Sequence, residues 1–558
     1  MSDIFKKGIF YSVIICTLAI FNSCSDVLKE VIYSELTPDN AFVTQEDAIA
    51  AVNGIYDPLH GITNRGIFFL NDVTTDAGFS RRSANCEYLE EINLSGNEDV
   101  RRSWQSYWRM IARANIAIDN ISPMDEDRFD EGLKARLLSE AYFLRALSYY
   151  NLTDLFYTVP LVTDSNVEID AILPPTPIDE IDAQIEKDLL SAKAALPLSY
   201  ANQEAGRAAY GSAVAYLCRL HMRTAGRTRL NGGDATTSWN KALEHVNEIL
   251  KLEQDGVYVL QPHLWENIFN PQSQAALYNK ELIFVVRSNP NSVAGTTDIG
   301  MAFTPWEYDM GWDLIHIPLE FAWKFDKTDE RYSELLVTEF PGVYNEPGWE
   351  EYYKIPASID KVRTVYEEET YVEDDYYDVI YEMSSAYTKK YAYTKTWTYN
   401  YNTGNNMIMA RLSDFILCKA EILNELNGPS AEAVNLINRV RERAFQNTAH
   451  NLKLADYGSK EALRSAICDE RALELNLEGV RRPDLIRMGL WKNRLDEYVA
   501  TIKLKSEWAE KNAGGNADFS SWWKVYPADL QEKDIRRYFP VPKRESDINP
   551  LLNDCRKF

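Results

Sequence analysis

The chain has 558 residues, of which 45% are hydrophobic and 26% are charged, and its formal net charge at pH 7 is −25. A chain of this length exceeds the size of one compact core, so we expect several packed units with the composition of an ordinary globular protein. The negative charge argues against nucleic-acid binding, since phosphate recognition requires a cationic surface. Its 33 Tyr, 21 Phe and 13 Trp exceed the needs of a helical core and suit a surface that stacks on flat ligand faces.

The first 23 residues have the layout of a secretory signal peptide. Lys6 and Lys7 form a short positive region, an almost unbroken apolar stretch runs from Ile9 to Phe21, and small residues precede Cys24. This stretch is too short to span a bilayer comfortably, so the pattern predicts a cleaved signal. The sequence Phe-Asn-Ser-Cys resembles a bacterial lipobox, which implies cleavage before the cysteine and lipid attachment to its thiol. An ordinary signal peptide with a coincidental cysteine is the alternative.

Apolar residues recur at helical spacing in two long parts of the chain, and each part is expected to fold into helix pairs. Asn427-Gly428-Pro429 is a helix stop signal, and Ser430 can cap the helix that follows. Consecutive helices joined by tight turns predict a tetratricopeptide-like array. The expected helices are 104–118, 136–151, 181–195, 210–222, 239–250, 412–426 and the segment after Ser430.

The stretch from 258 to 401 differs from the helical parts. It is rich in Pro, Gly, Asn, Tyr and Trp, and it contains a short strand-like run at 282–286. Long irregular segments inside a compact protein are usually functional, so we expect the ligand here. The predicted fold is mostly α, with few short strands. The predicted division is 1–23 signal peptide, 24–35 flexible leash, 36–257 helical region, 258–401 loop-rich binding lobe and 402–558 helical region.

Short motifs follow one another in a fixed order along the chain. They are AIAAVNGIY at 48–56, EAYFLRA at 140–146, YTVPL at 157–161, ICDERALELNLEGVRRPDLIR at 467–487 and FPVP at 539–542. Each motif is weak alone, but their order behind a lipoprotein signal resembles the SusD/RagB family over essentially the whole mature length. The resemblance implies a tetratricopeptide-like helical scaffold that supports an irregular binding lobe.

The resemblance also implies a location and a function. It implies a cell-surface lipoprotein of the outer membrane of Bacteroidetes-type bacteria, anchored through Cys24. Such a protein captures a glycan without cleaving it and delivers it to a SusC-like TonB-dependent outer-membrane transporter. A RagB-like lipoprotein that captures oligopeptides stays open as an alternative. A secreted glycoside hydrolase is disfavoured, because no nucleophile or metal constellation is recognisable in the sequence.

Aromatic residues in a Pro/Gly-containing loop are the leading candidates for glycan binding. The segment 301–312 reads MAFTPWEYDMGW, and a loop can present aromatic faces to the apolar faces of sugar rings. In the family, aromatics from this region and groups near the N-terminal helix hold the glycan. By position, the resemblance implies a ligand-binding set of Trp306, Tyr308, Trp312, Asp76, Arg81 and Trp104. Trp104 also fits the apolar stripe of its own helix, and we favour a core position for it.

Glu470 and Glu474 are the sharpest catalytic candidates, since they stand one helical turn apart and a glycosidase needs two carboxylates. Carboxylates on adjacent turns of one helix rarely straddle a sugar bond, however, and a buried carboxylate is costly without a cation. Several arginines lie close in sequence, among them Arg471 and Arg481. We therefore favour a buried ion-pair network that locks this helix to the chain after Gly479.

Signals for metals and cofactors are weak. The six histidines show no paired spacing, so no cofactor and no histidine metal site is predicted. The acidic cluster between Glu367 and Asp378 could hold structural calcium, but a solvated acidic loop is favoured because no EF-hand spacing organises the ligands. Cys218, Cys418 and Cys468 lie in apolar helical stretches, where buried free thiols are expected.

Overall fold

The computed structural model describes residues 41–62, 66–80, 96–168, 171–201, 204–270, 273, 279–288, 299–304, 312, 314–337, 385–391, 405–498 and 537–554. Cys24, Arg81, Trp306, Tyr308 and the acidic cluster at 367–378 lie outside the described residues. Among the helices that the structure describes, none combines the length and the apolar character that crossing a bilayer requires.

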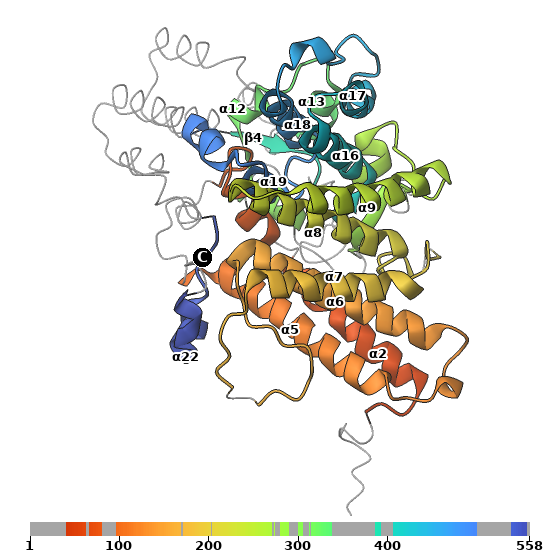
Figure 1. Ribbon diagram of the computed structural model, residues 1–558. Coiled ribbons are helices and arrows are strands. Elements are labelled where there is room, and N and C mark those ends of the chain that lie inside the picture. Colours follow the sequence, from red (N-terminus) through yellow and green to blue (C-terminus); the bar gives the residue numbers. More distant parts are fainter. Residues whose placement is uncertain are drawn as a thin grey trace, which may run out of the picture.

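The first half of the chain folds into helices that pack against their neighbours in sequence. They are α2 (Gln45–Tyr56), α3 (Pro58–Gly61), α5 (Glu98–Ile121), α6 (Leu133–Phe156), α7 (Ile178–Ala195), α8 (Tyr210–Leu230) and α9 (Thr236–Gln254). Contacts join α5 to α6, α6 to α7, α7 to α8 and α8 to α9, and Figure 1 shows this succession of layers. The five helices predicted in this part are confirmed, each longer than its apolar stripe.

A second group of helices follows the middle segment. It contains α16 (Leu412–Asn427), α17 (Ala431–Phe445), α18 (Lys460–Glu474), α19 (Arg481–Met488) and α22 (Lys543–Ile548). Helix α16 packs on α9, on α17 and on α18, so it joins the two helical groups (Figure 1). Gly428 ends α16 with a φ of 81°, and the hydroxyl of Ser430 accepts a hydrogen bond from the N–H of Ala433, as the stop and cap signals predicted.

Short elements connect the two groups. The strands are β1 (Leu282–Val286), β2 (Ile317–Pro318), β3 (Leu336–Val337), β4 (Ser385–Thr388) and β5 (Met407–Arg411). Strands β1 and β5 form one antiparallel pair, and β2, β4 and β3 form a second antiparallel sheet in that order. The short helices are α11 (Ile299–Phe303), α12 (Leu319–Ala322) and α13 (Glu330–Leu335). The strand predicted at 282–286 is confirmed as β1.

Single turns complete the described structure. Two are π-helical, η2 (Phe69–Val73) and η6 (Trp265–Phe269), and η4 (Glu126–Arg128), η7 (Leu454–Asp456) and η9 (Pro550–Asp554) are 3-10 turns. The core runs through both helical groups, and it contains Cys218, Cys418 and Cys468 as buried free thiols, which confirms that prediction.

A buried network of ion pairs surrounds the C-terminal end of α18. The carboxylate of Glu474 is fully buried and contacts the guanidinium groups of Arg411 at 2.5 Å, Arg443, and Arg331 at 3.4 Å. Glu470 shares Arg331 with it, at 2.8 Å. Every carboxylate in this cluster is therefore matched by at least one cation, as burial of charge requires.

The network confirms the structural interpretation of the carboxylate pair, Glu470 and Glu474, but corrects the origin of its cations. Arg471 does join α18 to α19, through a 2.7 Å ion pair with Asp484. The cations that neutralise Glu470 and Glu474, however, come from β5, α13 and α17, far away in sequence, and not from Arg471 or Arg481. Sequence proximity gave the wrong partners because Arg471, which directly follows Glu470, lies on another face of α18, and because Arg481 pairs with Asp76.

Candidate functional site

The two ends of the aromatic loop meet at a hydrogen-bonded base. The N–H of Trp312 donates to the carbonyl of Met301 at 2.8 Å, and the N–H of Leu314 donates to the carbonyl of Ala302 at 2.9 Å. Two of the three predicted stacking aromatics, Trp306 and Tyr308, come between these ends in sequence and lie outside the described residues. The loop therefore leaves and rejoins the described structure at one place.

The base of this loop rests on buried aromatic residues. Phe303, the last residue of α11, contacts Phe68 edge-on with ring centroids 5.1 Å apart, and its ring lies 5.0 Å from that of Tyr391. All three rings are essentially inaccessible to solvent. Edge-to-face aromatic packing of this kind fixes ring orientation as well as burying apolar area. The residues at the base of the loop thus pack directly against the buried core.

Backbone hydrogen bonds bring the two predicted ligand-binding segments together. The N–H of Phe79 donates to the carbonyl of His316 at 2.9 Å, and the N–H of His316 donates to the carbonyl of Phe79 at 2.8 Å. Phe79 lies between Asp76 and Arg81 in sequence, and His316 follows Trp312 by four residues. Segments far apart in sequence therefore lie side by side, close to the end of the described stretch 66–80 and to the start of the described stretch 314–337.

Asp76 lies at the base of this arrangement and is engaged in a buried ion pair. Its carboxylate is 5% exposed and accepts hydrogen bonds from Arg481 at 2.8 and 2.7 Å, and Lys324 lies 3.5 Å away. Burial opposes ionisation, but the charge and hydrogen bonds of Arg481, together with Lys324, hold the pKa of Asp76 below its ordinary value. The pair joins the segment before Phe79 to α19.

The structure places the other two described candidates differently. Trp312 is partly buried and packs against the core. Trp104 is 4% exposed and meets the ring of Phe156 edge-on at 4.9 Å, between α5 and α6. A ring enclosed in this way presents no face to a ligand, so Trp104 contributes to the packing of the helical scaffold.

Three residues near Asp76 and Phe79 were not among the predicted site residues. His316 is fully buried, and its ring lies 4.7 Å from that of Tyr387. Lys324 and Arg481 surround the carboxylate of Asp76. No spacing in the sequence links these groups, because each comes from a different element and only the tertiary fold brings them together.

Two small cavities lined by described residues lie beside α19. Their volumes are about 60 and 40 Å³, and the larger is lined in part by Tyr157, Tyr538 and Arg223. Volumes of this size hold a few water molecules. Neither has room to enclose a sugar ring, so neither replaces the aromatic loop as the candidate site.

Comparisons with known proteins bear on the family and the fold of the chain. A family model described as "Starch-binding associating with outer membrane" matches residues 29–222, and a model described as "SusD family" matches residues 311–555. A SusD-like protein of Formosa agariphila is 28% identical to this chain, and the match covers 97% of both chains.

Solved structures share the fold. A SusD homologue from Bacteroides thetaiotaomicron superposes with a TM-score of 0.69 at 21% identity, covering 92% of this chain and 97% of that one. Surface glycan-binding protein A from the same organism, solved in complex with laminarihexaose, has a TM-score of 0.65 at 17% identity and covers 91% of this chain and 99% of its own. The ordered motifs, the two family models and the shared helical architecture lead to one conclusion: the chain belongs to the SusD family.

Proposed function

We propose that this protein captures a glycan at the cell surface without cleaving it. The observation that carries the proposal is the backbone pairing of Phe79 with His316, which sets the end of the Asp76 segment beside the base of the aromatic loop. The SusD family is non-catalytic, and one matching family model is described as starch-binding. A structural neighbour was solved with laminarihexaose, which supports an oligosaccharide as the class of ligand.

Each predicted residue has a distinct role in this proposal. Trp306, Tyr308 and Trp312 provide stacking faces for sugar rings, and Arg81 donates hydrogen bonds to hydroxyl groups. Asp76 acts as a positioning residue, because its carboxylate is already bound by Arg481. Its ion pair holds the segment that leads to Arg81 against the C-terminal helices.

The test is titration calorimetry of the purified protein with oligosaccharides, comparing the native protein with the Trp306→Ala, Trp312→Ala double variant. We expect the affinity to fall at least about tenfold, since each lost stacking contact contributes on the order of 1 kcal/mol. Tyr457→Ala is the matched control, because this partly exposed aromatic beside η7 belongs to another part of the fold. Unchanged affinity in the double variant would refute the site.

Trp312 requires one further comparison, because its ring also packs against the core. Melting curves of the double variant separate loss of binding from loss of folding. A Trp306→Ala single variant, compared with the native protein, isolates one stacking face. A tenfold weaker affinity of the double variant at an unchanged melting temperature supports the proposed role of the loop.

The proposal includes delivery of the glycan to a SusC-like TonB-dependent transporter. Cys24 would carry the lipid that holds the protein on the outer membrane, and residues 24–35 would form the leash between lipid and binding unit. Cell fractionation of a Cys24→Ala variant tests the anchor: we expect release from the membrane fraction. Unchanged membrane association would contradict the lipid anchor, and co-purification with the native protein tests the transporter contact separately.

A further inference from the structure

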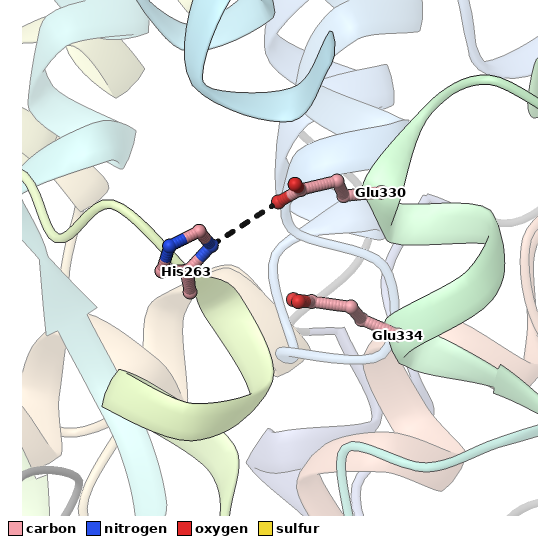
Figure 2. Close-up of side chains that lie close together, drawn as sticks. All are labelled: His263, Glu330 and Glu334. Atoms are coloured by element: carbon pink, nitrogen blue, oxygen red, sulfur yellow. Dashed lines mark ion pairs between the residues drawn. The ribbon is translucent and has the colours of Figure 1, made fainter. Parts of the chain in front are cut away.

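Three side chains of types that can ligate a metal ion come together from two segments of the chain. His263 precedes η6, whereas Glu330 and Glu334 occupy one face of α13, a single helical turn apart. One ligand atom from each of the three residues lies within 4.8 Å of the other two, and Figure 2 shows the side chains facing a common space. The imidazole Nδ1 lies 3.5 Å from a carboxylate oxygen of Glu330.

Hydrogen bonds hold the segment around His263 in place. The amide of Gln446 donates to the carbonyl of Pro262 at 3.1 Å and to Glu330 at 3.2 Å. The N–H of Trp265 donates to one oxygen of Glu334 at 3.1 Å, which leaves the other oxygen of that carboxylate for a further partner. Both segments are therefore connected before any ligand binds.

The charge balance of α13 differs between its two faces. On the buried face, Arg331 neutralises Asp329 and Glu470. On the other face, within the part of the chain that the structure describes, neither Glu330 nor Glu334 forms an ion pair with a lysine or arginine. Lys389 acts electrostatically on Glu334, but its ammonium donates to the carbonyl of Ser333 at 2.9 Å. Among the described residues, two carboxylates and a histidine thus share a space in which no lysine or arginine forms an ion pair with them.

We propose that His263, Glu330 and Glu334 bind a divalent transition-metal ion of the zinc type. An imidazole nitrogen favours such an ion over calcium or magnesium, and carboxylate oxygens complete a common ligand set. Zinc bonds of about 2.0–2.2 Å place tetrahedral ligands roughly 3.4 Å apart. His263 is 50% exposed and Glu330 is 29% exposed, so small rotations bring their ligand atoms inward. Water supplies the fourth ligand, and the ion joins the segment before η6 to α13.

The experiment is calorimetric titration of the purified, EDTA-treated protein with Zn²⁺, together with Co²⁺ absorption spectra. We expect saturable one-to-one binding of Zn²⁺, a visible Co²⁺ band and a melting temperature that rises by a few degrees with zinc. His263→Ala and the Glu330→Gln, Glu334→Gln double variant should each weaken Zn²⁺ binding at least tenfold, since loss of groups that merely support a metal ligand costs 10–100-fold.

His450→Ala is the matched control, because His450 is also partly exposed and, among the described residues, forms an ion pair with one carboxylate, that of Asp326 at 3.9 Å. Melting in EDTA verifies that the variants remain folded, and the Co²⁺ band reports coordination by the histidine independently of stability. Absence of saturable binding by the native protein would overturn the site. One-to-one binding that survives His263→Ala, or that falls equally in His450→Ala, would overturn it as well.

Discussion

Glu474 is the residue at which one substitution tests the buried ion-pair network. Its carboxylate is fully buried among the guanidinium groups of Arg411, Arg443 and Arg331. Burial opposes the charge, but the three arginines hold the pKa of Glu474 well below its ordinary value. Glu474→Gln keeps the size of the side chain but removes the negative charge that the three guanidinium groups share. Breaking a buried ion pair from one side costs about 3–5 kcal/mol, so we expect the free energy of unfolding to fall by that amount.

Urea denaturation of the purified protein measures this change. The control is Glu244→Gln, the same substitution at an exposed position in the middle of α9, where we expect no measurable change. Equal stability of the Glu474→Gln variant and the native protein would refute the structural role of the network. Loss of hydrolysis of a polysaccharide at unchanged stability would instead favour the catalytic interpretation of the carboxylate pair.

Three further substitutions test local features. Burial raises the pKa of Asp72 to about 8, so the unfolded state ionises first and stability from this group is lost as pH rises from about 4 to 8. Melting curves should therefore show that Asp72→Asn stabilises the protein more at pH 8 than at pH 5. Gly479→Ala should lower the free energy of unfolding by about 2 kcal/mol in urea denaturation, because Gly479 has a φ of 76° and the added Cβ would lie 2.7 Å from Ile67. Ser430→Ala should lower it by about 1 kcal/mol in the same assay, since the N–H of Ala433 loses its cap.

Local patterns predicted most of the helical scaffold. The stop at Gly428 and the cap at Ser430 depend on residues within one helical turn, so the sequence displays them directly. The apolar stripes of α5 to α9 can also be read locally, because each stripe consists of residues three or four positions apart in the same helix. The helices extend beyond these stripes, and part of the added length is itself buried, as at Leu152 and Phe156 of α6 and at Ala225 of α8.

Tertiary contacts were harder to predict. The sequence indicated that Glu470 and Glu474 need cations, but it did not show that Arg331 and Arg411 supply them. The same holds for the metal-ligand cluster: the one-turn spacing of two glutamates on α13 is visible in sequence, whereas His263 reaches them only in the folded chain. Partners of this kind depend on how elements pack, which local spacing does not encode.

The candidate glycan site was predicted in part. The aromatic loop and the segment after Asp76 were identified as separate regions by resemblance, and the structure pairs their ends through Phe79 and His316. Trp104 shows why a binding role cannot be assigned from position in the family alone. Its position matches ligand-binding residues of the family, whereas its helical spacing matches the apolar stripe of its own helix. Its burial against Phe156 is decided by the packing of α5 on α6.

The central claim is that this protein binds a glycan and does not cleave it. Native gel electrophoresis in the presence of a panel of polysaccharides, with reducing ends measured in parallel, tests both parts at once. We predict that at least one polysaccharide retards the protein and that no new reducing ends appear. Release of reducing ends would contradict the absence of catalysis, and no retardation by any polysaccharide combined with calorimetric binding of oligopeptides would contradict the glycan as ligand.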